Sequence, residues 1–208
     1  MAEADETYRT VAESASASFT VQGSEFIGHI APAESVEAAE AFVEQVTESY
    51  DNATHNVPAY RVRAGDSTLS SGMTREYSSD NGEPAGSAGK PALNVLQGED
   101  LENVVCVLTR YYGGTTLGTG GLARAYGRAT KEAIAAAGTI EQRPHERARV
   151  TVEYDDSGTV RGVLESDGIE FEAVYEERVT FAIRVSTSDS TSLYNRLRSA
   201  TSGRARIE

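Results

Sequence analysis

Three polar segments of the chain contain residues that can exchange protons or bind ions. The first spans residues 51–56, where His55 stands among polar neighbours at the entry to an expected strand. Because histidine changes charge near neutral pH, His55 beside a carboxylate would support acid–base chemistry. The alternative is a histidine that only forms a hydrogen bond within its own loop, and the sequence leaves both interpretations open.

The second segment places two carboxylates among glycines and other small residues, from Asp80 to Lys90. Asp80 and Glu83 share one expected turn, which suits a hydrated cation or a cationic group of a partner. In the alternative interpretation both carboxylates accept hydrogen bonds from neighbouring amides, and Ser87 starts a helix. Lys90 does not belong to a Walker motif, because the glycine spacing differs and Pro91 replaces the required Ser or Thr.

Glycines cluster in the third segment, residues 110–126, immediately before an expected helix. Unpaired N–H groups at a helix start, together with the positive end of the helix dipole, favour a phosphate or a carboxylate. Arg124 and Arg128 add positive charge to one face of that helix. Residues 118–123 also fit the dinucleotide fingerprint formally, but no strand enters them directly and no repeating parallel βαβ units follow. A purely structural glycine turn is the alternative to an anion or nucleic-acid backbone site.

Other catalytic and metal-binding patterns are missing from the sequence. It contains no GxSxG elbow, no Ser/His/Asp constellation and no Cys/His spacing typical of a metal site. We therefore assign no catalytic residue, no metal and no cofactor, and we expect a binding protein in preference to an enzyme. The binding candidates are His55, Asp80, Glu83, Lys90, Arg110, Gly118, Gly120, Gly121 and Arg124.

The chain is strongly acidic. Its 208 residues include 19 basic and 32 acidic side chains, a net charge of −13, and only Lys90 and Lys131 are lysines. Such a surface suits a salt-rich cytoplasm, because the Debye length falls to about 3 Å at about 1 M salt and charge repulsion is then weak. The composition therefore predicts a halophilic archaeon as the source. It does not exclude a nucleic-acid partner.

The cellular location is predicted from what the sequence lacks. The single cysteine, Cys106, stands in an apolar run, so a buried position is expected and a disulfide framework is excluded. No stretch approaches ~20 uninterrupted apolar residues, and the acidic N-terminus lacks the basic and apolar regions of a signal peptide. We expect a cytoplasmic protein without a membrane partner.

Hydrophobic periodicity and turn residues predict the elements that position the three segments. Ser35 caps an expected helix over residues 36–50, and Pro58 places the next strand, residues 56–63, at a sheet edge or a bulge. The strand over residues 103–111 is the most apolar and is expected to be central. The other predicted elements are a tail or short edge element (1–16), strands 18–22 and 25–31 around a turn at 23–24, a polar stretch (64–90), a helix over 88–97 capped by Ser87, and a helix over 122–137 that ends at Gly138.

After Arg143 and Pro144 the pattern changes to strand, helix, strand, strand, helix, strand. This order is the ferredoxin-like pattern. We therefore predict an α+β protein with two domains, residues 1–140 and residues 146–208. The predicted elements of the second domain are 146–154, 159–166 (a helix capped by Ser157), 169–175, 178–185, 190–200 and 204–207.

The three polar segments, in this order, resemble the IMPACT N-terminal family, whose bacterial members include YigZ. The matching pieces are residues 23–28, 53–56 with 59–61, 80–93 and 110–126, and the resemblance covers residues 17–137. The C-terminal segment is similar to the small ferredoxin-like domain of the bacterial and archaeal members and to the last domain of elongation factor G. Three positions depart from the family pattern: Asn81 replaces a carboxylate, Val57 a cysteine, and Thr116 a basic residue.

The resemblance implies that the first domain has the ribosomal protein S5 domain 2-like fold. Eukaryotic IMPACT proteins regulate translation by competing for an activator of a translation-initiation kinase, whereas no agreed catalytic activity attaches to the prokaryotic members. We therefore expect a translation-linked regulator that binds the ribosome, RNA or a translation factor. The alternative is a hydrolase, or another enzyme of phosphorylated small molecules, with His55, Asp80, Glu83 and the glycine segment in one cleft. The sequence does not determine the oligomeric state.

Overall fold

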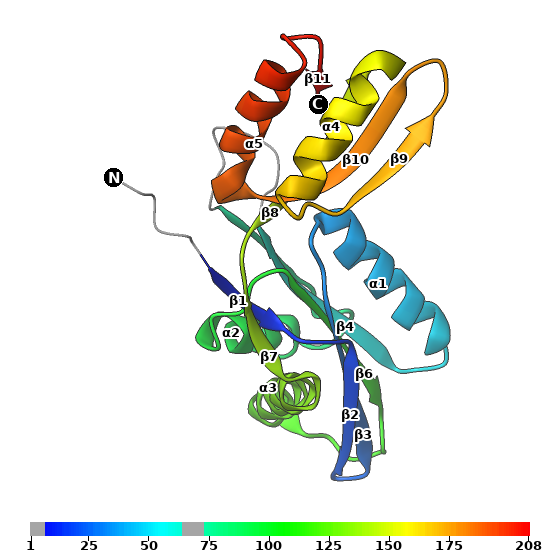
Figure 1. Cartoon of the computed structure of the whole chain (residues 1–208). Helices are drawn as coiled ribbons and strands as arrows, with labels where there is room; N and C mark the ends of the chain where they lie inside the picture. Colours follow the sequence, from blue (N-terminus) through cyan, green and yellow to red (C-terminus); the bar gives the residue numbers. More distant parts are fainter. Residues whose placement is uncertain (1–6, 64–72) are drawn as a thin grey trace. The chain divides into compact units, whose positions relative to one another are not determined.

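The computed structural model describes residues 7–63 and 73–208 (Figure 1). They form two compact units, one of Tyr8–Gln142 and one that contains Arg143–Glu208 together with Thr7. Both units combine helices with antiparallel sheets, so the predicted α+β class is confirmed. Part of the predicted N-terminal tail and of the polar stretch over residues 64–90 lies outside the described residues. No helix in the described ranges is long and apolar enough to cross a membrane.

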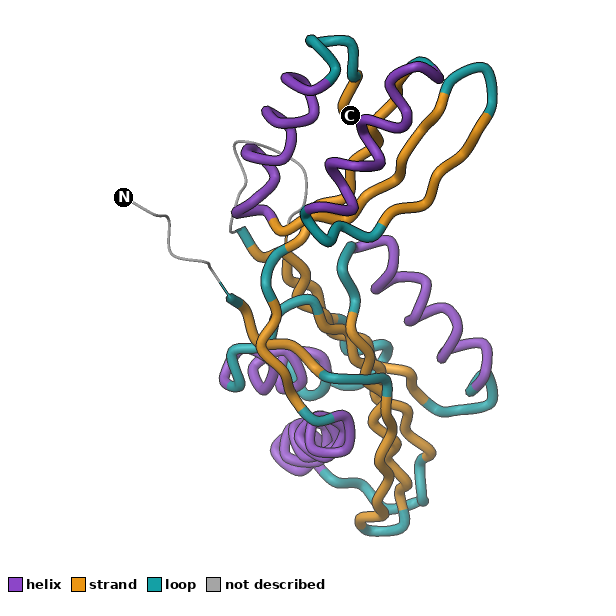
Figure 2. The backbone as a smooth tube through the Cα atoms, in the orientation of Figure 1, coloured by secondary structure: helices purple, strands orange, loops and turns teal. Residues whose placement is uncertain are grey.

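The N-terminal unit is built on a five-stranded antiparallel sheet in the order β2-β3-β6-β4-β5. Helices α2 and α3 cover one face of this sheet and α1 covers the other (Figures 1 and 2). A two-stranded sheet pairs β1 with β7. The elements are β1 (Tyr8–Val11), β2 (Ala15–Val21), β3 (Ser24–Pro32), α1 (Val36–Ser49), β4 (His55–Arg63), β5 (Thr74–Ser78), α2 (Gly89–Gly98), β6 (Val104–Tyr111), α3 (Gly118–Ala137) and β7 (Thr139–Gln142).

Strand β6 is central, as its apolar sequence predicts. Val104, Cys106 and Leu108 belong to the core beneath α2 and α3, whereas Val105 belongs to the smaller core beneath α1. Since successive side chains of a strand point to opposite faces, only a strand covered on both faces has such a continuous apolar run. Cys106 is completely buried, and this burial raises the pKa of its thiol to about 12. The thiol is therefore protonated and inert at neutral pH.

The start of α1 confirms the predicted cap, because the Ser35 hydroxyl accepts a hydrogen bond from the Ala38 N–H at 3.1 Å. The prediction for Pro58 was wrong: β4 is an inner strand between β6 and β5. Pairing with β5 begins only at Ala59, and the Pro58 carbonyl accepts from Ser79, the residue after β5 ends. Pro58 is tolerated inside the sheet because its nitrogen, which has no hydrogen to donate, lies at a position where β5 has already ended and no ladder hydrogen bond is lost.

Strands β5 and β7 were not predicted, and β1 was expected only as a tail or short edge element. Residues Tyr8–Val11 form β1, which satisfies the short-element alternative for the N-terminal segment and pairs with the unpredicted β7. Strand β5 lies in the polar stretch, where Tyr77 stacks on Tyr60 of β4 at 5.2 Å between ring centroids. An edge strand needs few apolar residues because one side of it remains in solvent, so its sequence gives a weak periodic signal.

The C-terminal unit is a four-stranded sheet in the order β11-β8-β10-β9, with strand and helix order β-α-β-β-α-β as predicted. Helix α4 begins several residues before the expected cap, and the Ser157 hydroxyl donates to the Tyr154 carbonyl instead of capping. The predicted cap at Ser157 was therefore wrong. The elements are β8 (His145–Val152), α4 (Tyr154–Ser166), β9 (Phe171–Tyr175), β10 (Val179–Ser186), α5 (Thr187–Ala200) and β11 (Arg206–Ile207).

Candidate functional site

Three strands bring the polar segments to one end of the N-terminal sheet. Phe26 of β3 and His55 of β4 are the two cross-strand partners of Arg110 in β6. Directly paired residues of neighbouring strands share one face of a sheet. Because Phe26 belongs to the core beneath α2 and α3, Arg110 and His55 also lie on that face.

The centre of this cluster is a buried ion pair between Arg110 and Glu83. Arg110 Nη1 lies 2.6 Å from Glu83 Oε1, and the two side chains are only 6% and 3% exposed. The Tyr126 hydroxyl of α3 donates to the same carboxylate oxygen at 2.7 Å. The guanidinium also lies 5.4 Å from the ring centroids of Phe26 and Tyr112. Glu83 therefore joins the segment before α2 to β6 and to α3.

Tyr126 keeps its proton in this arrangement. Burial is the largest cause that raises its pKa, and the hydrogen bond to Glu83 raises it further. The phenol therefore acts as a permanent hydrogen-bond donor. Sequence analysis gave Tyr126 no role, although a tyrosine spaced with buried residues on one helix face needs a partner for its hydroxyl.

His55 approaches the ion pair without joining it. His55 Nε2 lies 3.8 Å from Glu83 Oε1, which is beyond hydrogen-bond distance. The other ring nitrogen, Nδ1, lies 2.7 Å from the carbonyl oxygen of Asn81. Since a carbonyl oxygen only accepts, Nδ1 carries a proton and donates it. The structure therefore brings His55, Glu83 and Arg110 together, with the histidine held by the loop.

The turn that holds His55 has a clear local origin. Asn81 and Gly82 both have positive φ, 46° and 85°, and Asn-Gly is a favoured pair for such a turn. A Cβ on Gly82 would lie 3.4 Å from the His55 ring. The Asn81 side chain accepts from the Asn56 N–H at 3.0 Å. Asn81, a departure from the family pattern, thus fixes the entry of β4.

Asp80 lies in the same loop but serves the start of α2. Its carboxylate accepts three backbone hydrogen bonds, from Gly86 at 2.7 Å, Ala88 at 3.0 Å and Gly89 at 2.9 Å. The predicted cap by Ser87 was wrong, because its hydroxyl donates to the Pro84 carbonyl instead. The amide-binding alternative for this carboxylate therefore describes the observed geometry.

The glycines of the third segment belong to helix α3, whereas the prediction placed them in a turn before it. Gly118, Gly120 and Gly121 form the first turn of α3, so the helix starts before the expected residue, Leu122. The backbone N–H groups of this turn have no side-chain cap from Leu117, the residue that precedes the helix. Residues 118–120 are exposed.

Lys90 and Arg124 lie on the outer faces of α2 and α3. Both side chains are exposed, and within the described part of the chain neither forms an ion pair with a carboxylate. The guanidinium of Arg124 folds back toward Gly120, where it lies 3.6 Å from the position of a Cβ. Neither residue contributes to the buried Glu83 and Arg110 pair, so the candidates divide into a buried cluster and an exposed cationic group.

In residues 7–63 and 73–208, no three His, Cys, Asp or Glu side chains lie together as a set of metal ligands. The two carboxylates that the sequence offered for a cation are occupied by internal donors, Asp80 by amides and Glu83 by Arg110 and Tyr126.

Replacement of Asp80 by alanine is expected to lower the free energy of unfolding by about 1–2 kcal/mol at neutral pH, as for loss of a helix cap. Burial raises the pKa of Asp80, but the hydrogen bonds from Gly86, Gly89 and Ala88 together hold it below its usual value. The stabilisation is therefore present above the unfolded-state pKa of about 3.9 and is lost as pH falls through the folded-state pKa.

Urea unfolding of the wild type and Asp80→Ala, followed from neutral to acidic pH, measures this difference. The two stabilities should converge in acid, because the wild-type carboxyl is then protonated as well. Asp51→Asn, which removes an exposed carboxylate from the turn before β4, serves as the charge control. A difference that persists unchanged down to about pH 2 would contradict a role for the ionised carboxylate.

Comparison with known proteins gives one family match in each of the two units. Residues 22–134 match the Impact N-terminal domain, and residues 150–204 match a domain of unknown function, DUF1949. The IMPACT family member YvyE of Bacillus subtilis is 30% identical over 203 residues, which cover 97% of this chain and 90% of YvyE. The IMPACT family member YigZ of Escherichia coli is 38% identical over 144 residues, 69% of this chain and 68% of YigZ. A crystal structure described as that of a hypothetical protein superposes with a TM-score of 0.71 at 29% identity, covering 97% of this chain and 96% of the other.

Proposed function

The chain belongs to the IMPACT family, and from this premise we propose that it is a translation-linked regulator that binds the ribosome, its RNA or a translation factor. The observation that carries the proposal is the division of the polar groups in the three segments. Asp80 and Glu83 accept internal hydrogen bonds and Glu83 also pairs with the buried Arg110, whereas Lys90, Arg124 and the start of α3 are exposed. An arrangement of this kind suits recognition of an anionic partner.

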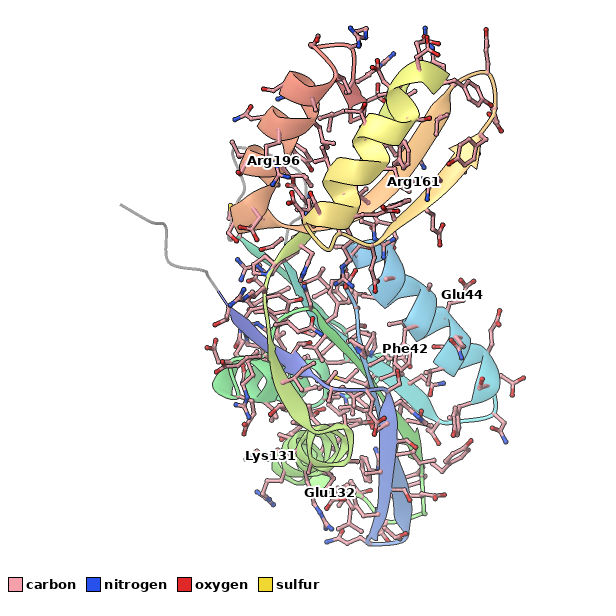
Figure 3. All side chains as sticks on the ribbon, viewed as in Figure 1. Phe42, Glu44, Lys131, Glu132, Arg161 and Arg196 are labelled. Carbon is pink, nitrogen blue, oxygen red and sulfur yellow. The ribbon has the colours of Figure 1, made fainter. Side chains whose placement is uncertain are left out.

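Helices α2 and α3 form the cationic surface. They pack against each other on one face of the sheet and contain four basic residues but only one acidic residue, Glu132. The remainder of the chain has 15 basic and 31 acidic residues, so these helices reverse the overall charge balance. Figure 3 shows Lys131 and Glu132 on the outer side of α3. The basic residues are Lys90, Arg124, Arg128 and Lys131.

Not all of this charge is equally available. Arg128 is held by an ion pair with Glu132 at 2.7 Å and by the Phe19 ring, whose centroid lies 4.0 Å from its guanidinium carbon. Arg124 and Lys131 are exposed, and no ion pair to either is found in the described part of the chain. With the uncapped first turn of α3, they provide charge and N–H donors on the same helix.

The geometry gives less support to a hydrolase that uses His55, Asp80 and Glu83 together. Glu83 is 3% exposed and already accepts from Arg110 and Tyr126, so it would have to break a buried ion pair to receive a proton. Asp80 is committed to three amides. His55 lies 3.8 Å from Glu83, outside the reach that direct proton transfer requires. Binding therefore explains the arrangement better than catalysis.

The conditions of binding follow from the composition. With a net charge of −13 and two lysines, we propose that the protein works in the cytoplasm of a halophilic organism. Purely electrostatic contacts weaken as salt rises, so helix N–H donors and bidentate arginine contacts must contribute there. Binding is therefore to be measured at both low and molar KCl.

Co-sedimentation with ribosomes tests the proposed function. The wild-type protein is expected to sediment with ribosomes, and Arg124→Ser/Lys131→Ser is expected to bind at least about tenfold more weakly, because hydrogen bonds to charged groups each contribute about 1.5–3 kcal/mol. The matched control, Arg161→Ser/Arg196→Ser, removes the same charge from α4 and α5 and should bind like the wild type. Wild-type protein that remains entirely in the free fraction, with no bound RNA, would refute the proposal.

A further inference from the structure

Strand β2 lies at one edge of the five-stranded sheet and lacks the usual protection of such an edge. Its seven residues, Ala15–Val21, include no charged side chain, no proline and no glycine. The pairing with β3 continues along the whole strand without a bulge. Edge strands of natural proteins normally carry charges, prolines or bulges, which prevent them from pairing with another chain. In a chain of which 25% of the residues are charged, a neutral edge of this length is therefore unusual.

The other edges of the two larger sheets are charged. Strand β5, at the opposite edge of the N-terminal sheet, contains Arg75 and Glu76. In the C-terminal sheet the edge strands are β9, which contains Glu172, and β11, which contains Arg206. Among the edge strands of these two sheets in the described ranges, β2 is thus the one without charge. Its edge differs from the others in the property that normally keeps chains apart.

The turn between β2 and β3 determines which backbone groups of β2 point away from the sheet. Gln22 and Gly23 have φ values of 48° and 82°, the pattern of a two-residue type I′ hairpin. Val21 and Ser24 on either side of this turn are therefore the first hydrogen-bonded pair. Along an antiparallel ladder, hydrogen-bonded pairs alternate with pairs that are not hydrogen-bonded. The residues of β2 whose N–H and carbonyl groups point away from β3 are Ser16, Ser18 and Thr20.

Strand β3 gives the same assignment from its other side. The Ala33 N–H donates to the Asn103 carbonyl at 2.8 Å, in the register of the β3–β6 ladder. Odd-numbered residues of β3 thus bond to β6, and even-numbered residues such as Phe26 and Gly28 bond to β2. Within the described ranges, no backbone hydrogen bond from any element reaches the three outward residues of β2. The edge therefore presents three N–H donors and three carbonyl acceptors.

The sequence of β2 is complementary to itself about Ser18. When two copies of the strand pair antiparallel with Ser18 opposite Ser18, Ser16 is opposite Thr20, and every outward N–H meets an outward carbonyl. The hydroxyl side chains then meet on one face of the sheet, where cross-strand pairs of this kind are favourable. No like charges come opposite each other. The residues on the other face are apolar and partly buried: Ala15, Ala17, Phe19 and Val21.

We propose that two copies of this chain associate through β2, which joins their five-stranded sheets into one continuous sheet. Antiparallel pairing places the twofold axis perpendicular to this sheet, between the two Ser18 residues, so α2 and α3 of both copies lie on the same face. Arg128, whose guanidinium carbon lies 4.0 Å from the centroid of the Phe19 ring, already has Glu132 as its ion-pair partner. The dimer does not depend on the function proposed above, but it presents the basic residues of these helices twice to one partner.

Sedimentation equilibrium of the full-length chain, at low and at molar KCl, tests the proposal. The wild type is expected to have the mass of two chains. Ser18→Pro removes the central outward N–H but no hydrogen bond to β3, and it should weaken dimerisation about thirtyfold, because two hydrogen bonds of the interface are lost. Ser18→Ala keeps the N–H and is the matched control, which should dimerise within about fivefold of the wild type. Circular dichroism verifies that each variant is folded.

Charge variants at the same position test the register. Ser18→Glu and Ser18→Lys each place like charges opposite each other, so at low KCl each should dimerise more weakly than the wild type. An equimolar mixture of the two should form a heterodimer about fivefold more tightly than either variant pairs with itself. Ser192→Glu adds the same charge at an exposed position of α5 and should dimerise like the wild type.

Three results would overturn the proposal. Wild-type protein that remains monomeric at both salt concentrations shows that β2 does not pair with itself, and the ribosome experiment described above is unaffected by that outcome. A dimer that is equally tight in Ser18→Pro and Ser18→Ala forms through another surface. A mixture of the Glu and Lys variants that dimerises no more tightly than either alone contradicts the pairing of Ser18 with its own copy.

Discussion

Glu83→Ala is expected to lower the free energy of unfolding of the N-terminal unit by about 3–5 kcal/mol, because it leaves a buried arginine without its counter-charge. The Arg110 side chain is 6% exposed and has Glu83 as its only carboxylate partner among the described residues. The Tyr126 hydroxyl loses its acceptor in the same variant. The free energy of unfolding of Glu83→Gln should lie between those of the wild type and Glu83→Ala, since an amide oxygen still accepts one hydrogen bond but carries no charge.

Urea unfolding measured by far-ultraviolet circular dichroism gives these values. Glu132→Ala removes the partner of Arg128 from an exposed pair, 55% and 35% accessible, and should cost only about 0–1 kcal/mol. Adding Arg110→Met to Glu83→Ala should recover part of the loss, because the unpaired charge is then gone. A Glu83→Ala variant as stable as Glu132→Ala would show that solvent reaches Arg110 and that the pair is not the centre of the fold.

Gly28→Ala is expected to destabilise the same unit by about 1–3 kcal/mol through overpacking, toward the upper end of that range. Gly28 lies in β3 where α3 crosses the sheet, and a Cβ there would come 2.5 Å from the Ala129 carbonyl oxygen and 3.1 Å from the Ala133 Cβ. Both obstacles belong to a buried helix face. The helix would have to move away from the strand, which would also displace Tyr126 from Glu83.

Gly127→Ala is the matched control, since it makes the same substitution inside α3 itself. A Cβ at Gly127 would meet only the Val95 side chain of α2, at an ordinary contact distance of 3.8 Å. Alanine there should raise the free energy of unfolding by about 0.5–1 kcal/mol, the usual helix preference over glycine. A loss of unfolding free energy in Gly28→Ala together with a gain in Gly127→Ala, measured by thermal or urea unfolding, would support the close packing of β3 on α3. A change of the same sign in both variants would contradict it.

Secondary structure was predictable where a single capping residue or a continuous apolar run identifies the element. Ser35 caps α1, and the continuous apolar run around Cys106 identifies β6 as the central strand. The cap depends on a hydrogen bond within a few residues, and the position of β6 depends on burial of the whole segment. Strands β5 and β7 were missed, and β1 was expected only as a tail or short edge element, because short strands gain most of their stability from pairing with distant residues.

For the candidate site, the sequence singled out the segments that contribute to the buried cluster but not the contacts that their residues make. His55, Glu83 and Arg110 are far apart in the chain and lie together in the structure. Nothing local to Glu83 shows that Arg110 neutralises it, because the ion pair depends on how the segment before α2 packs against the end of β6. The tyrosine that completes the cluster comes from another element, α3.

The amino-acid sequence alone determined the fold class, the order of elements in the C-terminal unit and the excess of carboxylates, because these follow from local periodicity and composition. Only the tertiary structure decided which charges are used internally and which remain on the surface. Asp80 and Glu83 have internal partners, while Arg124 and Lys131 remained exposed. The physical reason is that the availability of a charged group depends on its distance to partners elsewhere in the chain, and that distance is set by packing and strand register.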